Sequence, residues 1–331
     1  MKCIHVAFSG PSPAAPQPRL PIPLSWGMML LVLLLGLAPG AAQALTPIPK
    51  VTVAASIVPL GEFCRRIGGE QVVVSVLIPP GASPHVFEPQ PSVVARAMAA
   101  RVFVYVGAGL DPWAERLLQA GGLKAQGPAV VEATAGVPLF RDVHDHQLRQ
   151  AGKPQEKHSG QAGGNPHIWL DPVLAQDICR RIAQALIQAD PSHRSYYEAN
   201  LGRYLGELEA LHREIEAKTA SFRLKAFVCF HPSFTYFARR YGLQEAGVIE
   251  ISPGREPTPR HIQRLVAAIR RHQVQVVFGE PQLSPRVAET IAKEAGVKVL
   301  VVDPLGGGPP YGDDYLKMMR HNLGVMEQAM R

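Results

Sequence analysis

The feature that most constrains this chain is a repeated alternation of short β-branched runs with helical patterns. Residues 50–55 have the composition of a buried strand, and residues 57–67 follow with apolar side chains at helical spacing. Strands predicted over residues 72–78 and 101–106 are likewise followed by helical segments. Such alternation predicts the α/β class, with parallel sheets covered by helices.

Two segments interrupt this alternation and divide the chain. Residues 141–165 hold glycines, histidines and charged side chains with almost no apolar residue, so their composition predicts a mobile loop. Residues 191–220 predict a long helix, and the strand–helix alternation resumes after it. The apolar residues of this helix form one stripe: Leu201, Leu205, Leu208, Leu211 and Ile215. We therefore expect a first α/β lobe over residues 45–190, a linking helix over 191–220 and a second α/β lobe over 221–331.

The N-terminal segment has the pattern of a secretory signal. Residues 28–37 form an uncharged apolar run, which is shorter than the roughly 20 residues that cross a bilayer. The sequence Ala42-Gln43-Ala44 then offers small residues at a cleavage position. We expect residues 1–44 to be a signal peptide that is removed after Ala44, which implies export of the mature chain.

Composition narrows the class further. The net charge is +7, but charged residues make up only 18% of the chain and no long run of like charges occurs, which disfavours a nucleic-acid-binding protein. The cysteines beyond the leader, Cys64, Cys179 and Cys229, have apolar neighbours. We expect buried thiols rather than a disulfide framework.

Histidines and an aspartate lie at the starts of predicted loops. His85 lies in the turn after a strand of the first lobe, and His231 and Asp303 directly follow strands of the second lobe. His167 comes out of the predicted loop into a segment bracketed by prolines. Parallel sheets bind ligands beyond the carboxyl ends of their strands. Three imidazoles and one carboxylate form a four-ligand shell that suits Zn²⁺, whereas manganese prefers more oxygen ligands. The wide sequence separations favour a site assembled between the lobes.

Five ordered segments around these residues resemble one known family. The segments are GASPHVFEP at 81–89, NPHIWLDP at 165–172, FHPSF at 230–234 leading into YFARRYGL at 236–243, FGEPQ at 278–282 and VDPLG at 302–306. They resemble the metal-binding solute-binding proteins of ABC transporters, in the zinc and manganese (ZnuA/TroA-like) family. The resemblance runs from about Val51 to the C-terminus.

The resemblance implies two α/β lobes joined by one long helix, with a divalent metal in the cleft between them. It implies His85, His167 and His231 as ligands and Asp303 as the carboxylate. Manganese-selective relatives often carry a carboxylate where this chain has His231, so zinc is favoured and a manganese-specific protein is the alternative. The implied function is high-affinity capture of Zn²⁺ in the periplasm by a monomer. The implied partners are the transmembrane permease and cytoplasmic ATPase of an ABC transporter.

Other polar residues near these segments have two interpretations each. Glu280 also follows a strand and would either orient a ligand imidazole or cap a turn. Glu88 would either support the loop of His85 or pair with a surface arginine. Cys229 would face the same way as His231 in an extended strand, so a thiolate ligand is the alternative to a buried thiol.

The predicted mobile loop contains further histidines: His144, His146 and His158. Histidine-bearing loops at this place are typical of zinc-binding members of the family. The loop of this chain has only these three, so they would either collect metal or belong to a plain solvated loop.

A secreted zinc hydrolase is the rival from a different class. It needs an open coordination position and a general base, but Asp303 as the fourth ligand would fill that position. The sequence also holds no His-Glu-x-x-His helix and no Gly-x-Ser-x-Gly elbow. A carrier of chelated metal would need basic and aromatic cleft residues, and a metal-stabilised adhesin would lie at the outer surface. We therefore expect a transport protein and not an enzyme.

Overall fold

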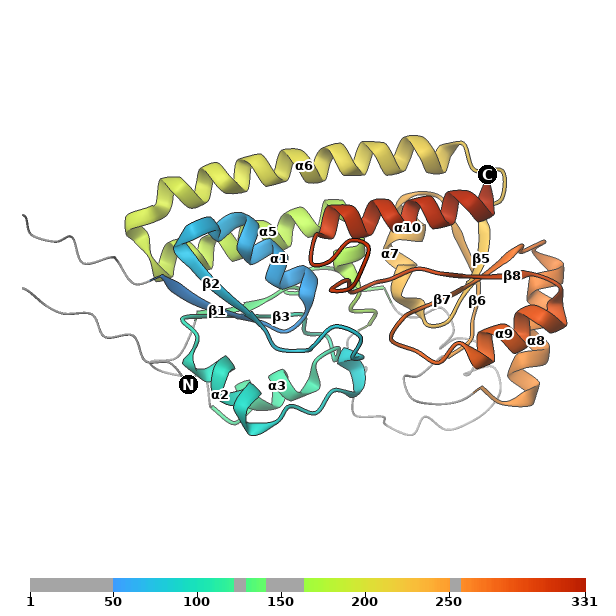
Figure 1. Ribbon diagram of the computed structural model, residues 1–331, viewed down its shortest axis with the longest axis horizontal. Helices are drawn as coiled ribbons and strands as arrows, with labels where there is room; N and C mark the ends of the chain where they lie inside the picture. Colours follow the sequence, from blue (N-terminus) through green and yellow to red (C-terminus); the bar gives the residue numbers. More distant parts are fainter. Residues whose placement is uncertain (1–49, 122–128, 141–163, 251–256) are drawn as a thin grey trace, which may run out of the picture. The chain divides into compact units, whose positions relative to one another are not determined.

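Two four-stranded parallel sheets form the framework of the protein (Figure 1). The strand order is β2-β1-β3-β4 in the first sheet and β6-β5-β7-β8 in the second. The strands are β1 (Val51–Ala55), β2 (Val72–Val76), β3 (Val102–Tyr105), β4 (Ala129–Glu132), β5 (Ala226–Cys229), β6 (Gln244–Val248), β7 (Val276–Gly279) and β8 (Lys298–Val301). Parallel neighbours require crossover connections, which the helices between them supply. The predicted α/β class is confirmed.

The computed structural model describes residues 50–121, 129–140, 164–250 and 257–331. The predicted signal peptide and its cleavage position after Ala44 lie outside these residues, as does nearly all of the predicted mobile loop. The helices are α1 (Val58–Gly68), α2 (Pro91–Ala99), α3 (Pro112–Gln119), α5 (Pro172–Ala189), α6 (Arg194–Ala220), α7 (Thr235–Arg240), α8 (Pro259–Arg271), α9 (Arg286–Ala295) and α10 (Tyr315–Met330). Among the helices of the described ranges, none is long and apolar enough to cross a membrane.

Alternate residues of each strand pack on opposite faces of the sheets, because side chains in a strand point alternately to its two sides. In the first sheet Val102 and Val104 pack in the large core with α1 and α5, whereas Phe103 packs with α2 and α3. In the second sheet Phe227 packs toward α7 and α10, whereas Val228 packs toward α8 and α9. Both sheets are therefore covered on both faces, as their continuous apolar runs require.

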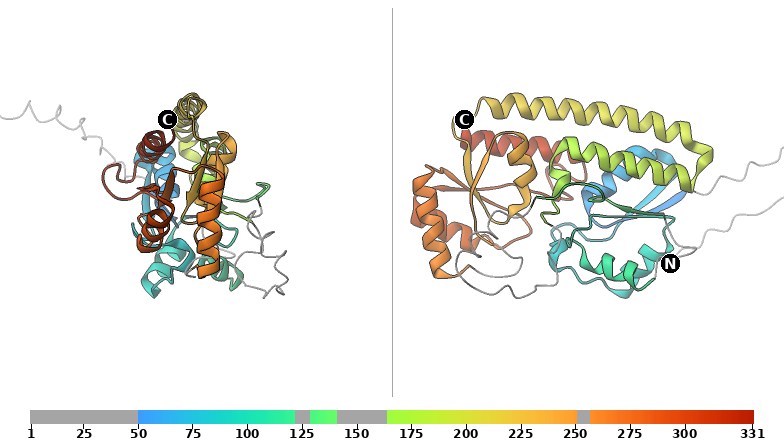
Figure 2. Two further views of the ribbon diagram at one scale, coloured as in Figure 1. Left: turned by 90° about the vertical axis from the view of Figure 1, so that its right-hand side faces the viewer. Right: turned by 180° about the vertical axis from the view of Figure 1, so that it is seen from behind.

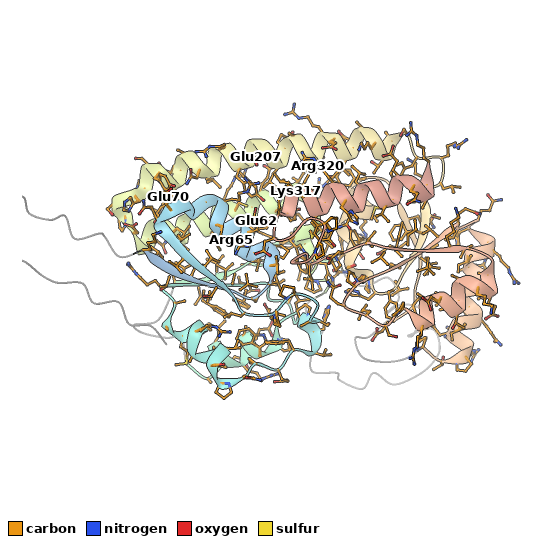
Figure 3. All side chains as sticks on the ribbon, viewed as in Figure 1. Glu62, Arg65, Glu70, Glu207, Lys317 and Arg320 are labelled. Atoms are coloured by element: carbon orange, nitrogen blue, oxygen red, sulfur yellow. The ribbon has the colours of Figure 1, made fainter. Side chains whose placement is uncertain are left out.

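One hydrophobic core runs through both lobes. It extends from the first sheet through α1, α5 and α6 to α7, α10 and the inner face of the second sheet. Trp169 is fully buried in it and donates its indole N–H to the carbonyl of Pro304 at 2.7 Å. The guanidinium of Arg65, which is labelled in Figure 3, forms an ion pair with Asp313 at 2.8 Å. This ion pair connects α1 to the loop before α10. Accordingly, Pro49–Arg331 form one compact unit.

The long helix α6 spans both lobes (Figure 2). It begins at Arg194, after a separate 3₁₀ turn at Pro191–His193, whereas the sequence predicted one helix from residue 191. Leu208, Leu211 and Ile215 of its apolar stripe are fully buried, and Leu201 and Leu205 pack against the core from partly buried positions. The helix therefore gives the two lobes a common support.

Two strands differ from the sequence prediction. We expected a strand over residues 248–252, but β6 occupies Gln244–Val248. Its first residues, Gln244 and Glu245, are polar because β6 is an edge strand, and the apolar run that marked a strand begins only where β6 ends. The short edge strand β4 was not predicted.

Candidate metal centre

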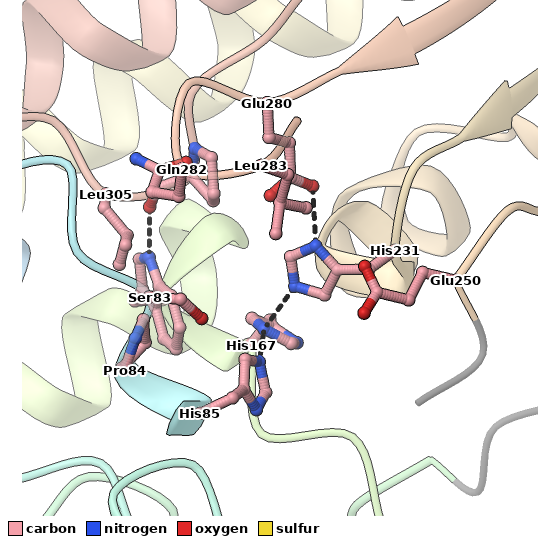
Figure 4. A pocket seen from close by; sticks show the side chains of 12 residues that line it. Ser83, Pro84, His85, His167, His231, Glu250, Glu280, Gln282, Leu283 and Leu305 are labelled. Atoms are coloured by element: carbon pink, nitrogen blue, oxygen red, sulfur yellow. Dashed lines mark hydrogen bonds and ion pairs between the residues drawn. The ribbon is translucent and has the colours of Figure 1, made fainter. Parts of the chain in front are cut away.

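The carboxyl ends of the parallel strands carry the candidate residues. Glu250, His231, Glu280 and Asp303 follow the ends of β6, β5, β7 and β8 in the second sheet. From the first lobe, His85 lies in the 3₁₀ turn Pro84–Val86 after β2, and His167 directly precedes the 3₁₀ turn Ile168–Leu170. One pocket is lined from both lobes, by His85 and His167 on one side and His231 on the other (Figure 4).

Three imidazoles converge in this pocket through their Nε2 atoms. The Nε2 atom of His167 lies 3.2 Å from that of His85 and 3.1 Å from that of His231. All three histidines offer ligand atoms within 4.8 Å of one another. Nitrogen ligands at about 2.0–2.1 Å in a tetrahedral shell would be separated by about 3.3 Å. The spacing of the three rings is therefore that of ligands around one small cation.

The other ring nitrogen of two imidazoles has a polar partner. The Nδ1 atom of His167 lies 2.9 Å from Oδ1 of Asn165, and Nδ1 of His231 lies 2.9 Å from Oε1 of Glu280. An oxygen acceptor at Nδ1 holds the proton there and leaves Nε2 as an unprotonated lone pair. Ser233 donates a hydrogen bond of 2.7 Å to the same Glu280 oxygen, which fixes the carboxylate.

The pKa values of the three histidines differ in direction. Burial, and then the neighbouring His231, lower the pKa of His85 to about 3. Burial and the other two rings lower the pKa of His167 well below its ordinary value. Burial alone would also lower the pKa of His231, but the Glu280 carboxylate, together with Glu250 and Glu245, outweighs burial and raises that pKa. Two of the three rings are therefore neutral and ready to bind a cation without first losing a proton.

Two carboxylates lie behind His231. Glu250 and Glu280 are both buried, with exposed fractions of 7% and 6%, and both line the pocket. Figure 4 shows them on either side of the His231 ring. Neutral imidazoles supply no charge to balance a divalent cation, and buried charge is costly unless it is compensated. The two carboxylates supply that compensation close to the rings.

Asp303 does not join the imidazoles. Its Oδ1 accepts hydrogen bonds from Gln282 Nε2 and from the backbone N–H groups of Leu305 and Gly306, at 2.9, 2.9 and 3.1 Å. Its Oδ2 accepts a hydrogen bond of 2.5 Å from the Tyr311 hydroxyl. Among the described residues, no carboxylate or thiol belongs to the three-histidine group. In this structure Asp303 organises the loop after β8, and its role as fourth ligand stays a prediction.

The remaining candidates divide between the pocket and the surface. Glu280 lies against the His231 imidazole, where its first interpretation would place it, and its role in orienting a metal ligand stays a prediction. Glu88 is exposed and pairs with Arg116 at 3.2 Å, which is its second interpretation. The thiol of Cys229 is buried beside Glu245, at 3.7 Å from Oε1, and lies outside the histidine group. The loop histidines, His144, His146 and His158, lie outside the described residues.

Sequence reasoning missed two residues of this site. Asn165 lies in a segment that carried the family resemblance, but its side chain had no assigned role. Glu250 was hidden because the strand predicted over residues 248–252 placed it within a strand. The structure ends β6 at Val248 and so puts Glu250 beyond a strand end, like His231 and Glu280. The other candidates were found because they follow the carboxyl ends of strands. The same criterion would have found Glu250 if the end of β6 had been predicted correctly.

Comparison with known proteins identifies the family of the chain. Residues 53–329 match the family described as zinc-uptake complex component A, periplasmic. The high-affinity zinc uptake system protein ZnuA of Bacillus subtilis is 30% identical over 287 residues, which are 85% of this chain and 88% of that protein. The zinc-binding protein AdcA of Streptococcus pyogenes serotype M3 is 31% identical over 287 residues, 84% of this chain and 55% of AdcA. The chain thus spans about half the length of AdcA.

A solved structure has the same architecture. The crystal structure of a ZnuA superposes with a TM-score of 0.72 at 33% sequence identity, covering 85% of this chain and 100% of that one. These matches confirm the predicted family, whose members are transport components and not enzymes. The chain belongs to the family of periplasmic component A of zinc-uptake complexes.

Proposed function

We propose that this protein captures Zn²⁺ in the periplasm and delivers it to the permease of an ABC transporter that a cytoplasmic ATPase drives. The observation that carries the proposal is the convergence of three Nε2 atoms from two lobes at spacings of 3.1 and 3.2 Å. Imidazole nitrogens suit zinc, whereas manganese favours carboxylate and water oxygens. Zinc is therefore the preferred cargo, and the processed chain, starting after Ala44, acts as a monomer.

Each pocket residue has a physical task in this function. His85, His167 and His231 bind the cation through Nε2. Glu280 and Asn165 hold the rings of His231 and His167 in the correct tautomer. Glu250 and Glu280 balance the charge of the cation. Asp303 stays the predicted fourth ligand, and to bind it would have to exchange the hydrogen bond from Tyr311 for the metal.

The test is the metal content and affinity of the processed chain. Protein purified without chelators should contain zinc by mass spectrometry, and it should bind zinc far more tightly than manganese in competition with a chromophoric chelator. His85→Ala, His167→Ala and His231→Ala should each weaken zinc binding by at least about a hundredfold, since loss of a ligand exceeds the 10- to 100-fold effect typical of its supporting partners.

The matched control is His272→Ala, which removes an exposed imidazole outside the pocket and should leave the affinity unchanged. Tight zinc binding that survives in His231→Ala would contradict the proposed site.

A further inference from the structure

Helix α8 has a strongly divided surface. Leu265, Val266 and Ile269 are buried against the second sheet, whereas the opposite face is fully exposed. At about 100° per residue, Arg260, Arg264 and Arg271 fall within about 40° of one another on that exposed face. Arg270 lies on the flank of the helix, about 80–120° around the axis from these three, and all four side chains are exposed. We call these four residues the α8 arginine face.

The sequence segment that carries these arginines has no acidic residue. The sequence from residue 257 to residue 279 contains no aspartate or glutamate. The described residues offer no ion pair or hydrogen bond to any of the four guanidinium groups. By contrast, most exposed arginines on the other helices pair with carboxylates, such as Arg180 with Asp177 at 2.7 Å. The fold therefore gathers uncompensated positive charge on one helix, although the sequence contains no run of like charges.

The α8 arginine face also lacks what a protein interface usually needs. None of the strongly exposed large apolar side chains of the described residues lies on α8. Protein interfaces are built around aromatic and apolar anchors at their centre. The exposed charged groups of α8 are all guanidinium groups. Such a convex helix instead fits a diffuse negative surface, such as anionic lipid headgroups, which attract each nearby arginine without a specific pocket.

The helix is fixed relative to the metal centre. The ring of His261, next to Arg260, lies with Nε2 2.8 Å from the carbonyl oxygen of Val248, the last residue of β6. That strand end also leads to Glu250 in the pocket. Figure 1 shows α8 beside α9 at the end of the second lobe, away from α6. The start of the arginine face is therefore anchored at the same sheet edge that carries His231.

We propose that the α8 arginine face binds the anionic phospholipid surface of the membrane. This contact concentrates the protein at the membrane and orients the sheet edge that carries the metal centre. The attraction is electrostatic, so it weakens as salt screens the charges. It does not depend on bound zinc.

The experiment measures the association of the processed chain with vesicles by flotation, with and without zinc. Vesicles of phosphatidylcholine alone are compared with vesicles containing about one third phosphatidylglycerol. We expect binding only to the anionic vesicles, lost near 1 M salt, where the Debye length is about 3 Å. The variant Arg260→Gln/Arg264→Gln/Arg270→Gln/Arg271→Gln should lose at least about tenfold in its partition onto anionic vesicles, because each arginine near the surface contributes separately.

The matched control removes the same net charge elsewhere, by Arg180→Gln/Arg194→Gln/Arg213→Gln/Arg331→Gln. Each of these arginines is exposed and already paired with a carboxylate. The control should keep its partition within about threefold of the unaltered chain, since its charges are compensated. Circular dichroism and zinc titration of both variants separate lipid binding from folding and from the metal site.

Three results would overturn the proposal. The first is equal binding to neutral and anionic vesicles. The second is an equal loss in the two quadruple variants, which would mean that only the total charge matters. The third is binding that depends on the arginine face but occurs only in membranes containing the permease, which would assign the face to an acidic protein surface.

Discussion

A neutral histidine carries its proton on one of two ring nitrogens, so a metal-binding histidine must have that proton held on the other one. For His167 the holder is Asn165, whose Oδ1 also accepts the backbone N–H of His167 at 3.0 Å. Asn165 is itself fixed, because its Nδ2 donates to the carbonyl of Pro232, next to His231, at 2.6 Å. One side chain thus connects the loops of His167 and His231, which come from different lobes.

We predict that Asn165→Ala weakens zinc binding by about 10- to 100-fold, the usual effect of losing the partner that orients a metal ligand. Asn165→Asp keeps an oxygen acceptor and should retain much more of the affinity. The control is Asn200→Ala, which removes another buried asparagine, bonded to the Ile67 carbonyl far from the pocket. It should lower the melting temperature without changing the zinc affinity. Equal zinc affinities in Asn165→Ala and the unaltered chain would exclude the orienting role.

The predicted ligand role of Asp303 can be separated from its structural role by two substitutions. If Asp303 binds the metal, Asp303→Asn should weaken zinc binding about tenfold or more, since it removes a charged oxygen ligand. Tyr311→Phe should strengthen it, because the hydroxyl no longer competes for Oδ2. Competition titrations measure both. A fall in melting temperature with unchanged affinity in both variants would leave Asp303 a structural residue only.

At the scale of single elements, the long helix α6 has a packed side and a free side. On α6 the packed side holds Tyr204, Leu208 and Leu211, whose side chains are 2% exposed or less. Its free side carries Gly202 and Gly206, where an added Cβ would meet nothing within 4 Å. Glycine in a helix interior costs backbone entropy without any packing return at these two positions.

We predict that Gly202→Ala and Gly206→Ala each raise the free energy of unfolding by about 0.5–1 kcal/mol. Gly247→Ala in β6 should instead lower the free energy of unfolding, because the new Cβ would lie 2.7 Å from the Leu265 side chain of α8. Denaturant titration with unchanged slopes measures all three. Destabilisation by the two α6 substitutions would show that this helix face has a partner.

At the scale of the whole molecule, the two lobes behave as one body because they share a core. The Tyr315 hydroxyl of α10 donates a hydrogen bond of 2.7 Å to the Trp169 carbonyl. The indole N–H of Trp169 in turn donates to the carbonyl of Pro304. These buried contacts hold the first-lobe loop of His167 against the loop that contains Asp303. We therefore expect zinc release to proceed through local loop movement rather than a wide opening of the lobes, and scattering curves of apo and loaded protein should superimpose.

The buried thiols provide a test of this unity. Burial raises the pKa of Cys64 in α1 to about 12 and the pKa of Cys229 in β5 well above its ordinary value. Both thiols therefore stay protonated at pH 8, and since the thiolate is the reactive form, iodoacetamide should label them only after unfolding.

We predict that Cys64 and Cys229 become labelled at the same denaturant concentration, although they lie in different lobes. Zinc at about 100 times its Kd should raise the free energy of unfolding by about 2.7 kcal/mol. Both labelling midpoints should therefore move together to higher denaturant, and chelation should reverse the shift. Mass spectrometry of labelled peptides measures each site. Labelling of Cys229 at lower denaturant than Cys64 would mean that the lobes unfold separately.

Some residues of the candidate site could be predicted from the sequence, and others could not. His85, His167 and His231 could be found because each follows a recognisable strand or proline-bracketed turn, and parallel strands bring such positions to one edge. Glu250 could not, since the polar edge strand β6 has too weak a pattern to show where it ends. The hydrogen bond from the Tyr311 hydroxyl to Asp303 could not be predicted from the sequence either, because it depends on how the loop before α10 folds back.

The sequence by itself determined the α/β class, most of the alternating strands and helices except β4 and the place of β6, the long helix and the three histidines that converge, because these depend on local periodicity and on residues that adjoin strand ends. Only the tertiary structure decided that the three Nε2 atoms converge and that Asn165 and Glu280 lie against two of the rings. Those facts depend on side-chain directions and on contacts between residues far apart in the chain. Packing of the shared core sets them, and no local pattern encodes them.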